Sequence, residues 1–181
     1  MTSAEQYKQE LKQSDIDHHT PTAGAMTGHI IANLLIHTLE VSQAKLFAQG
    51  PAVLFLTQYG NQWISYEQAV FDKLNCLLVN NGESIPTTTD QFKQFAMLEE
   101  NGASKYDSGT TQLFDLVKDF DTQTLFITKG ITLAQQAAWP ELVTVLSDLL
   151  AWIKDQIALT QRFLGHDLRT GLYTEEDDDD F

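Results

Sequence analysis

Four long segments of the chain carry apolar residues at successive steps of three and four, the spacing that places side chains on one face of an α-helix. No segment of comparable length alternates apolar and polar residues as a half-buried strand does. The pattern therefore predicts an all-α chain in which each helix buries one stripe against its neighbours. The four segments cover residues 23–48, 56–78, 113–138 and 140–164.

The links between these helices distinguish among the known kinds of helical bundle. Gly50–Pro51 separates the first two helices and Pro140 opens the fourth, so each pair is joined tightly. About 27 residues, 83–109, separate the two pairs. Bundles with alternating up and down helices use short loops throughout, whereas the ferritin-like topology needs a long crossover. The sequence therefore predicts a ferritin-like four-helix bundle over residues 23–168, with a short helix near 87–95 in the connection.

A polar segment precedes the predicted bundle. Residues 4–14 are rich in helix-forming Glu, Gln and Lys, but only Tyr7 and Leu11 form an apolar stripe. Residues 15–22 contain Pro and Thr and are expected to break the helix. The pattern predicts that residues 1–22 are an N-terminal helical arm, thin and solvent-exposed, followed by a linker.

The charge balance limits which partners the protein can bind. The chain has 25 acidic and 11 basic residues, a formal net charge of −14, and six of the acidic residues lie together at 175–180. Without these six, 19 acidic residues still face 11 basic ones, so nucleic acid can be bound only by a local patch. We interpret residues 169–181 as an acidic tail that keeps the protein soluble, with cation attraction or repulsion of DNA as alternatives.

Cysteine usage and hydropathy predict the compartment. The single cysteine, Cys76, permits no internal disulfide, and we expect it to be a small buried apolar residue rather than a metal ligand. The first residues show neither the basic nor the apolar part of a signal peptide, and no window approaches the length of a membrane span. We therefore expect a cytoplasmic protein, with association with the nucleoid left open.

The helix lengths and several punctuating residues resemble those of the Dps family, the ferritin-like proteins that protect bacterial DNA during starvation and peroxide stress. These residues are Gly50–Pro51 after the first helix, Gly82 closing the second, the short helix near 87–95 and Gly165 near the end of the fourth. The resemblance covers about residues 23–166. It implies a hollow homododecamer that binds DNA without sequence specificity and takes up iron.

The resemblance also implies a di-iron ferroxidase site between two subunits, which this chain does not keep. Counted from Gly50, the ligand positions of the family fall on Lys45, Thr57, Asn61, Asp72 and Cys76. Only Asp72 is a family ligand, and the Lys45 ammonium opposes cation binding. We predict weak or absent ferroxidase activity and no catalytic residue. Asp72 remains a candidate iron ligand, and its alternative role is pairing with a cation such as Lys45 across the dimer contact.

Two further candidate sites lie in the arm. Four metal-binding side chains occur within five residues and could share zinc or iron, although flexible surface side chains are the alternative: Asp15, Asp17, His18 and His19. Lys8 and Lys12 stand one helical turn apart, and the resemblance implies that such arm lysines contact DNA. A merely solvated helix is the competing interpretation. In an assembly, several weak phosphate contacts would act together and would be sensitive to salt.

The remaining histidines carry little signal. His37 and Glu40 form the only helical pair that could contribute to a bundle metal site, and without acidic partners on facing helices we expect surface or satisfied core residues. His29 and His166 are isolated in the sequence and receive no role.

Three functions remain to be distinguished. The leading hypothesis is a Dps-like cage that protects DNA by non-specific binding through its arms and takes up iron with poor or absent ferroxidation. The second is an iron-storage ferroxidase whose metal site has moved. The third is a non-catalytic helical interaction module that forms only a dimer.

Overall fold

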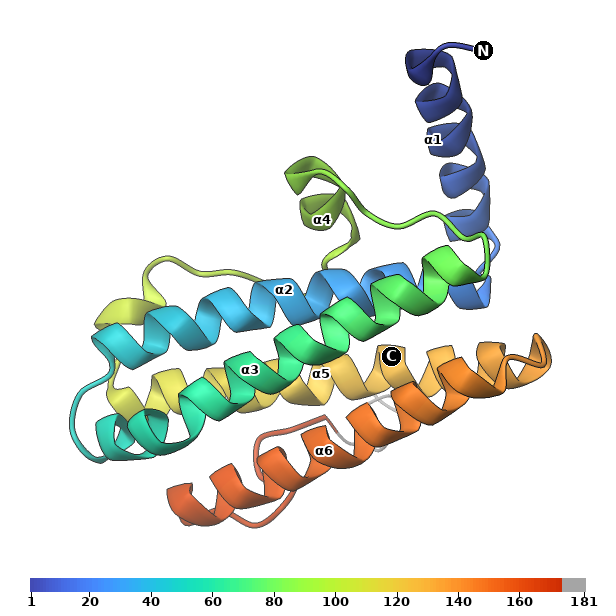
Figure 1. Cartoon of the computed structure of the whole chain (residues 1–181). Helices are drawn as coiled ribbons and strands as arrows, with labels where there is room; N and C mark the ends of the chain where they lie inside the picture. The colour runs from blue at the N-terminus through green and yellow to red at the C-terminus, as the bar shows by residue number, and fades with distance from the viewer. Residues whose placement is uncertain (174–181) are drawn as a thin grey trace, which may run out of the picture.

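Four long helices lie side by side and form the bundle that the sequence predicts (Figure 1). The structure is a computed structural model and describes residues 1–173. Within this range the chain is helical and contains no strand. The elements are α1 (Ser3–His19), α2 (Ala23–Phe47), α3 (Pro51–Asn80), α4 (Thr89–Phe95), the 3-10 helix η1 (Ser104–Tyr106), α5 (Gly109–Gln136) and α6 (Pro140–Leu164).

The ends of the bundle helices follow from local sequence signals. Pro51 and Pro140 each stand in the first turn of their helix, where a missing N–H costs nothing. Gly165 closes α6 in the left-handed conformation at φ 73°, which glycine adopts without a steric penalty. These boundaries confirm the two tight helix pairs.

The long connection contains the predicted short helix. The Thr88 hydroxyl accepts from the N–H of Gln91, and the Gln91 side-chain oxygen accepts from the N–H of Thr88. The helix α4 therefore starts with a capping box. Phe95 is buried where α4 packs against α2. The connection from Asn81 to Ser108 therefore carries the chain from the end of α3 to the start of α5, which is the crossover of a ferritin-like bundle (Figure 1).

The buried face of α2 differs in part from the one that apolar spacing predicts, which contains Ile30, Ile31, Leu34, Leu35, Leu39 and Val41. Four of these are buried, but Leu35 is only half-buried and Leu39 is 48% exposed. The reason is that α2 is apolar on most of its circumference, so the sequence does not reveal which side faces the core. No helix within residues 1–173 combines the length and apolar content needed to cross a membrane.

The arm helix is longer than predicted. We expected the helix to end at Ser14 and a linker to begin at Asp15, but α1 continues to His19. The Nδ1–H groups of His18 and His19 donate to the carbonyls of Ser14 and Asp15, which adds side-chain hydrogen bonds to the last turn. The break occurs instead just before Pro21, because proline restricts the residue that precedes it.

The residues after α6 return along the bundle. Arg169 donates to both carboxylate oxygens of Asp121 on α5, at 2.7 and 3.1 Å, and Leu172 is 7% exposed. The first residues of the predicted acidic tail, 169–173, therefore lie against α5. The acidic run at 175–180 lies outside the described residues.

Candidate functional site

The arm α1 presents two unpaired cations. It projects away from the bundle and none of its residues is buried (Figure 1). Lys8 and Lys12 are exposed, one turn apart, and neither forms an ion pair or hydrogen bond within residues 1–173. Glu5, the nearest acid toward the N-terminus, accepts from Thr2 in a capping box. The lysine ammonium groups are therefore available to an anionic partner such as a phosphate.

The four predicted metal ligands of the arm divide between two sides of α1. Asp15 and His19 are both exposed and lie 3.7 Å apart, on the solvent side. Asp17 accepts from Gln13 at 2.8 Å. His18 turns toward the bundle, where its ring stacks on Phe95 with a centroid distance of 4.2 Å. The fold therefore does not gather all four around one point.

His29 is a neighbour of the arm that the sequence analysis missed. Its ring lies 4.9 Å from that of His18, and its Nδ1–H donates to the Phe95 carbonyl at 2.8 Å. Burial lowers the pKa of His29, and a charge on His18 acts in the same direction. Since both histidines use Nδ1–H for a carbonyl, both keep a free lone pair on Nε2. The 11-residue separation across a helix break gave no sequence signal.

The unused Nε2 atoms do not by themselves make a metal site. The Nε2 atom of His18 is buried and has no hydrogen-bond partner among the described residues. Within the same residues, no three side chains of His, Cys, Asp or Glu come together in an arrangement that could hold a metal ion. A cation at this hinge would need further ligands from water or from a second copy of the chain.

The positions that correspond to the ferroxidase ligands fall into two separate groups on one subunit. Lys45 on α2 lies across Gly60 of α3 and donates to the Asn61 amide oxygen. A methyl group on Gly60 would stand 2.8 Å from Lys45 Cδ, so this glycine leaves room for the lysine. Thr57 donates to the Val53 carbonyl of its own helix. An ammonium therefore occupies the region in which a metal would need anionic ligands.

Asp72 and Cys76 form the second group. Both are exposed on α3, one turn apart. Eleven residues separate Asp72 from Asn61, about 16 Å along a helix, so one subunit cannot bring the two groups together. The expectation that Cys76 is buried is wrong for the subunit, because it lies on the side of α3 that faces away from the core.

The prediction for the His37 and Glu40 pair was half right. His37 is fully buried and hydrogen-bonded, as expected for a satisfied core residue. The expected absence of acidic partners on facing helices is wrong, because Glu67 on α3 and Asp119 on α5 both face this pair. The sequence could not show these partners, since they depend on how each helix is rotated about its axis.

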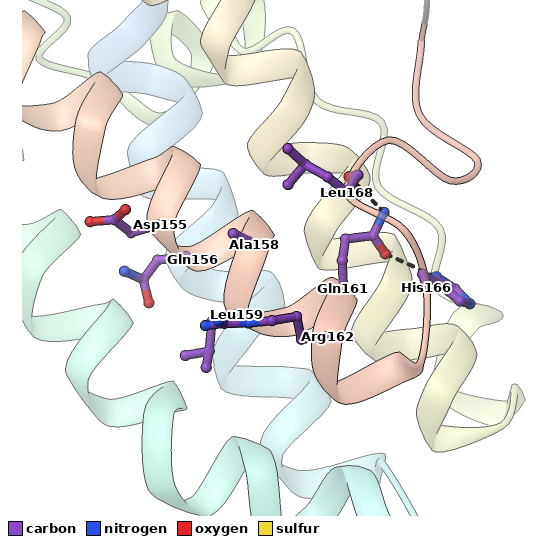
Figure 2. A pocket seen from close by; sticks show the side chains of 8 residues that line it. All are labelled: Asp155, Gln156, Ala158, Leu159, Gln161, Arg162, His166 and Leu168. Atoms are coloured by element: carbon purple, nitrogen blue, oxygen red, sulfur yellow. Dashed lines mark hydrogen bonds between the residues drawn. The ribbon is translucent and has the colours of Figure 1, made fainter.

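A pocket lies at the C-terminal end of α6, and several polar side chains that line it form hydrogen bonds with the segment after α6. Figure 2 shows Gln161 between His166 and Leu168, with one hydrogen bond to each. Gln161 also donates to the Thr170 carbonyl, and the Gln156 amide oxygen accepts from Trp63. His166 is thus not isolated, and it helps to anchor the segment that follows α6.

The fold and the arrangement of its polar groups define a ferritin-like bundle with an N-terminal arm. By sequence, no family model and no curated protein matches the chain. By structure, DpsB of Lactococcus lactis MG1363 is similar, with a TM-score of 0.86, 31% identity and 92% and 96% of the two chains covered. DpsA of the same organism gives a TM-score of 0.86, 28% identity and coverage of 92% and 98%. The chain belongs to the Dps family.

A more distant comparison supports the fold alone. A structure of Listeria innocua Dps soaked with cobalt has a TM-score of 0.78 and 22% identity, with 82% of this chain and 95% of that chain covered. The all-α ferritin-like fold predicted from the helix spacing is confirmed.

Proposed function

We propose that this protein is a Dps-like cage that protects DNA during starvation and oxidative stress by non-specific binding through its N-terminal arms. The observation that carries the proposal is the arm α1, which projects from the bundle with Lys8 and Lys12 exposed and unpaired within the described residues. Phosphate contacts from lysines do not depend on base sequence. The acidic body would contribute repulsion, so binding depends on the arms.

Assembly supplies the number of arms that two lysines alone lack. Large apolar side chains are exposed at the corner between α2 and α3 and on η1, with Leu46 77%, Leu54 75% and Tyr106 81% exposed. Apolar surface of this kind favours contact with further copies of the chain. A homododecamer would present about twelve arms, and contacts made together gain from effective concentration.

Gel retardation of the intact protein on duplex DNA tests this proposal. We expect the double variant Lys8→Ala/Lys12→Ala, and a chain lacking residues 1–20, to lose retardation at moderate salt. The matched control Lys93→Ala/Lys129→Ala removes two exposed lysines from the bundle and should retard DNA like the natural chain. Unchanged retardation by the arm variants would contradict the proposal. A protein that binds DNA in this way would be located in the cytoplasm, at the nucleoid.

We further propose that iron is bound without rapid ferroxidation. Lys45 and Asn61 satisfy each other, and Asp72 is the single family ligand left, so the pocket lacks the negative charge that two iron ions require. Ferrous oxidation followed by absorbance should be no faster than in buffer. Rapid, saturable oxidation would instead support the alternative of a ferroxidase with a relocated metal site.

A restored ligand set provides the matched comparison. The replacements put the family residues back at four positions: Lys45→His, Thr57→His, Asn61→Asp and Cys76→Glu. We expect this variant to oxidise ferrous iron about tenfold faster than the natural chain, which corresponds to about 1.4 kcal/mol of barrier. Equal rates in a folded variant would contradict the assignment of these positions.

The arm hinge is proposed as a second metal site, for zinc or iron. Because Asp15 and His19 face solvent while His18 faces the bundle, a cation would bind to one half, and the half with His18 and His29 offers two free Nε2 atoms. Asp17 and His18 line one small pocket at this hinge. Calorimetric titration with zinc should show binding that His18→Ala abolishes and His166→Ala preserves. Equal binding by the two variants would contradict the site.

A further inference from the structure

His37 stands near the middle of the bundle with a hydrogen-bond acceptor at each ring nitrogen. Its Nδ1 lies 2.6 Å from Glu67 Oε1, and its Nε2 lies 3.3 Å from the carbonyl oxygen of Leu116. A neutral imidazole carries only one N–H, and the Leu116 carbonyl can only accept, so Nε2–H donates to it. The contact with Glu67 then needs one further proton, on His37 Nδ1 or on the Glu67 carboxyl, and the raised pKa of His37 favours the imidazolium. One proton therefore joins α2 to α3 and to α5.

The partner of this imidazolium is equally buried. The side chains of His37 and Glu67 are both 0% exposed. The Thr38 hydroxyl lies 3.4 Å from the second oxygen of Glu67, but its single hydrogen is shared with the Leu34 carbonyl at 2.8 Å, so the imidazolium is the main partner of this carboxylate. Burial acts to lower the pKa of His37, but the Glu67 charge and hydrogen bond outweigh it and raise that pKa to about 9. The imidazolium is therefore the form held at neutral pH.

A second pair of acidic groups lies one helical turn away, Glu40 on α2 and Asp119 on α5. Glu40 Oε2 is buried and has no hydrogen-bond donor among the described residues, and the charge of Asp119 acts on Glu40. Two ionised carboxylates in such a site repel each other, which favours a proton on one of them. Burial and the nearby Asp119 charge raise the pKa of Glu40 to about 8, and burial also raises the pKa of Asp119. A proton on this pair removes the repulsion between α2 and α5 at this point.

The other charges that act on these groups come from the long connection and from α5. Glu100 of the long connection acts on Glu40, and its charge further favours the protonated carboxyl. On α5, Asp115 and Lys118 face Asp119, where they are paired with each other at 2.6 Å and act in opposite directions. The buried proton cluster is defined as His37, Glu40, Glu67 and Asp119.

We propose that the buried proton cluster is a proton-operated clasp: its two protons hold α2 against α3 and α5, and their loss at alkaline pH loosens α2 within the bundle. When His37 loses its proton, one of its two acceptors on the facing helices is left without a donor. When the carboxyl pair loses its proton, two negative charges face each other in a half-buried site. Both events weaken the contacts that hold α2 in the bundle.

The direction of the pH effect follows from the protons that folding retains. The unfolded chain releases the Glu40 proton near its ordinary pKa of 4.5 and the His37 proton near 6.5, whereas the folded chain keeps them to about 8 and about 9. Stability must fall as the pH rises wherever the folded state binds more protons than the unfolded state. The two windows overlap between the ordinary pKa of His37, 6.5, and the Glu40 value of about 8, where the fall is steepest.

Thermal unfolding of the intact protein at two pH values measures this fall. We expect the midpoint to be lower by roughly 5 °C or more at about pH 8.5 than at about pH 6.5. Glu40→Gln keeps a hydrogen-bonding side chain but cannot titrate, so it should remove a large part of the difference. Asp155→Asn changes an exposed carboxylate on α6 and should leave the difference intact. An equal pH dependence in all three proteins would overturn the proposal.

Infrared spectroscopy provides a readout that does not depend on how well a variant folds. The natural chain at neutral pH should show the carbonyl stretch of a protonated carboxylic acid, and the band should disappear as the pH is raised. Asp119→Asn should lack the titrating band. Absence of the band from the natural chain at neutral pH would overturn the proposal, because the clasp requires a proton on Glu40 or Asp119.

Discussion

The arm and the bundle are both helical, but different interactions stabilise them. No residue of α1 is buried, whereas α5 and α6 each bury residues along their whole length. The bundle is therefore stabilised by packing, and the arm by its caps, by the charge and hydrogen bonds at its ends and by a small contact at His18. The exposed face of α1 can therefore bind a partner without disturbing the packing of the bundle. This difference also explains why the proposed DNA contact and the proton clasp occupy separate parts of the subunit.

The largest expected effect comes from removing a ring from the bundle core. Phe120 is fully buried, with its ring 5.0 Å from Trp63 and 4.2 Å from His37. Phe120→Ala should lower the free energy of unfolding by about 3–5 kcal/mol in urea denaturation. Tyr7→Ala, the matched aromatic truncation in the arm, should change it by less than about 0.5 kcal/mol. A similar loss of unfolding free energy in both variants would contradict the difference between bundle and arm.

A glycine at the start of α5 tests how tightly the bundle corner is packed. A methyl group on Gly109 would stand 2.1 Å from the backbone oxygen of Gln49, and backbone cannot move aside as a side chain can. We expect Gly109→Ala to cost about 1–3 kcal/mol, measured by the same denaturation. Gly102→Ala, in a place with nothing within 4 Å, is the control and should be close to neutral. A neutral Gly109→Ala would mean that this corner is loose.

Two matched helix caps give the smallest expected effect. Thr22 caps α2 by accepting from the Ala25 N–H at 3.1 Å, and Thr2 caps α1 by accepting from the Glu5 N–H at 3.3 Å. Thr22→Ala should lower the stability of the bundle by about 1 kcal/mol. Thr2→Ala should reduce helicity measured by circular dichroism and leave the main unfolding transition in place. If Thr2→Ala shifted that transition equally, the arm would be part of the cooperative fold.

The sequence predicts the bundle well because its signals are local. Pro51, Pro140 and Gly165 determine helix ends through their own backbone preferences, and apolar spacing shows that a helix has a buried face. The end of α1 was missed because His18 and His19 add side-chain hydrogen bonds to the carbonyls of the last turn, which a count of helix formers does not consider.

The site residues were predictable only where one helix contains them. Lys8 and Lys12 share a turn, so their common face follows from their spacing. His18 and His29, by contrast, meet only because α1 and α2 cross at the hinge. Glu67 and Asp119 reach His37 and Glu40 from facing helices, and the rotation of each helix is decided by packing of the whole core.

The mass of the native particle in solution shows whether this chain assembles into a closed cage. A closed cage of this chain should give, by light scattering, about twelve times the subunit mass of 20.3 kDa, with the arms on its surface. A particle of two subunits would contradict the cage, and it would leave the arm lysines too few to hold DNA.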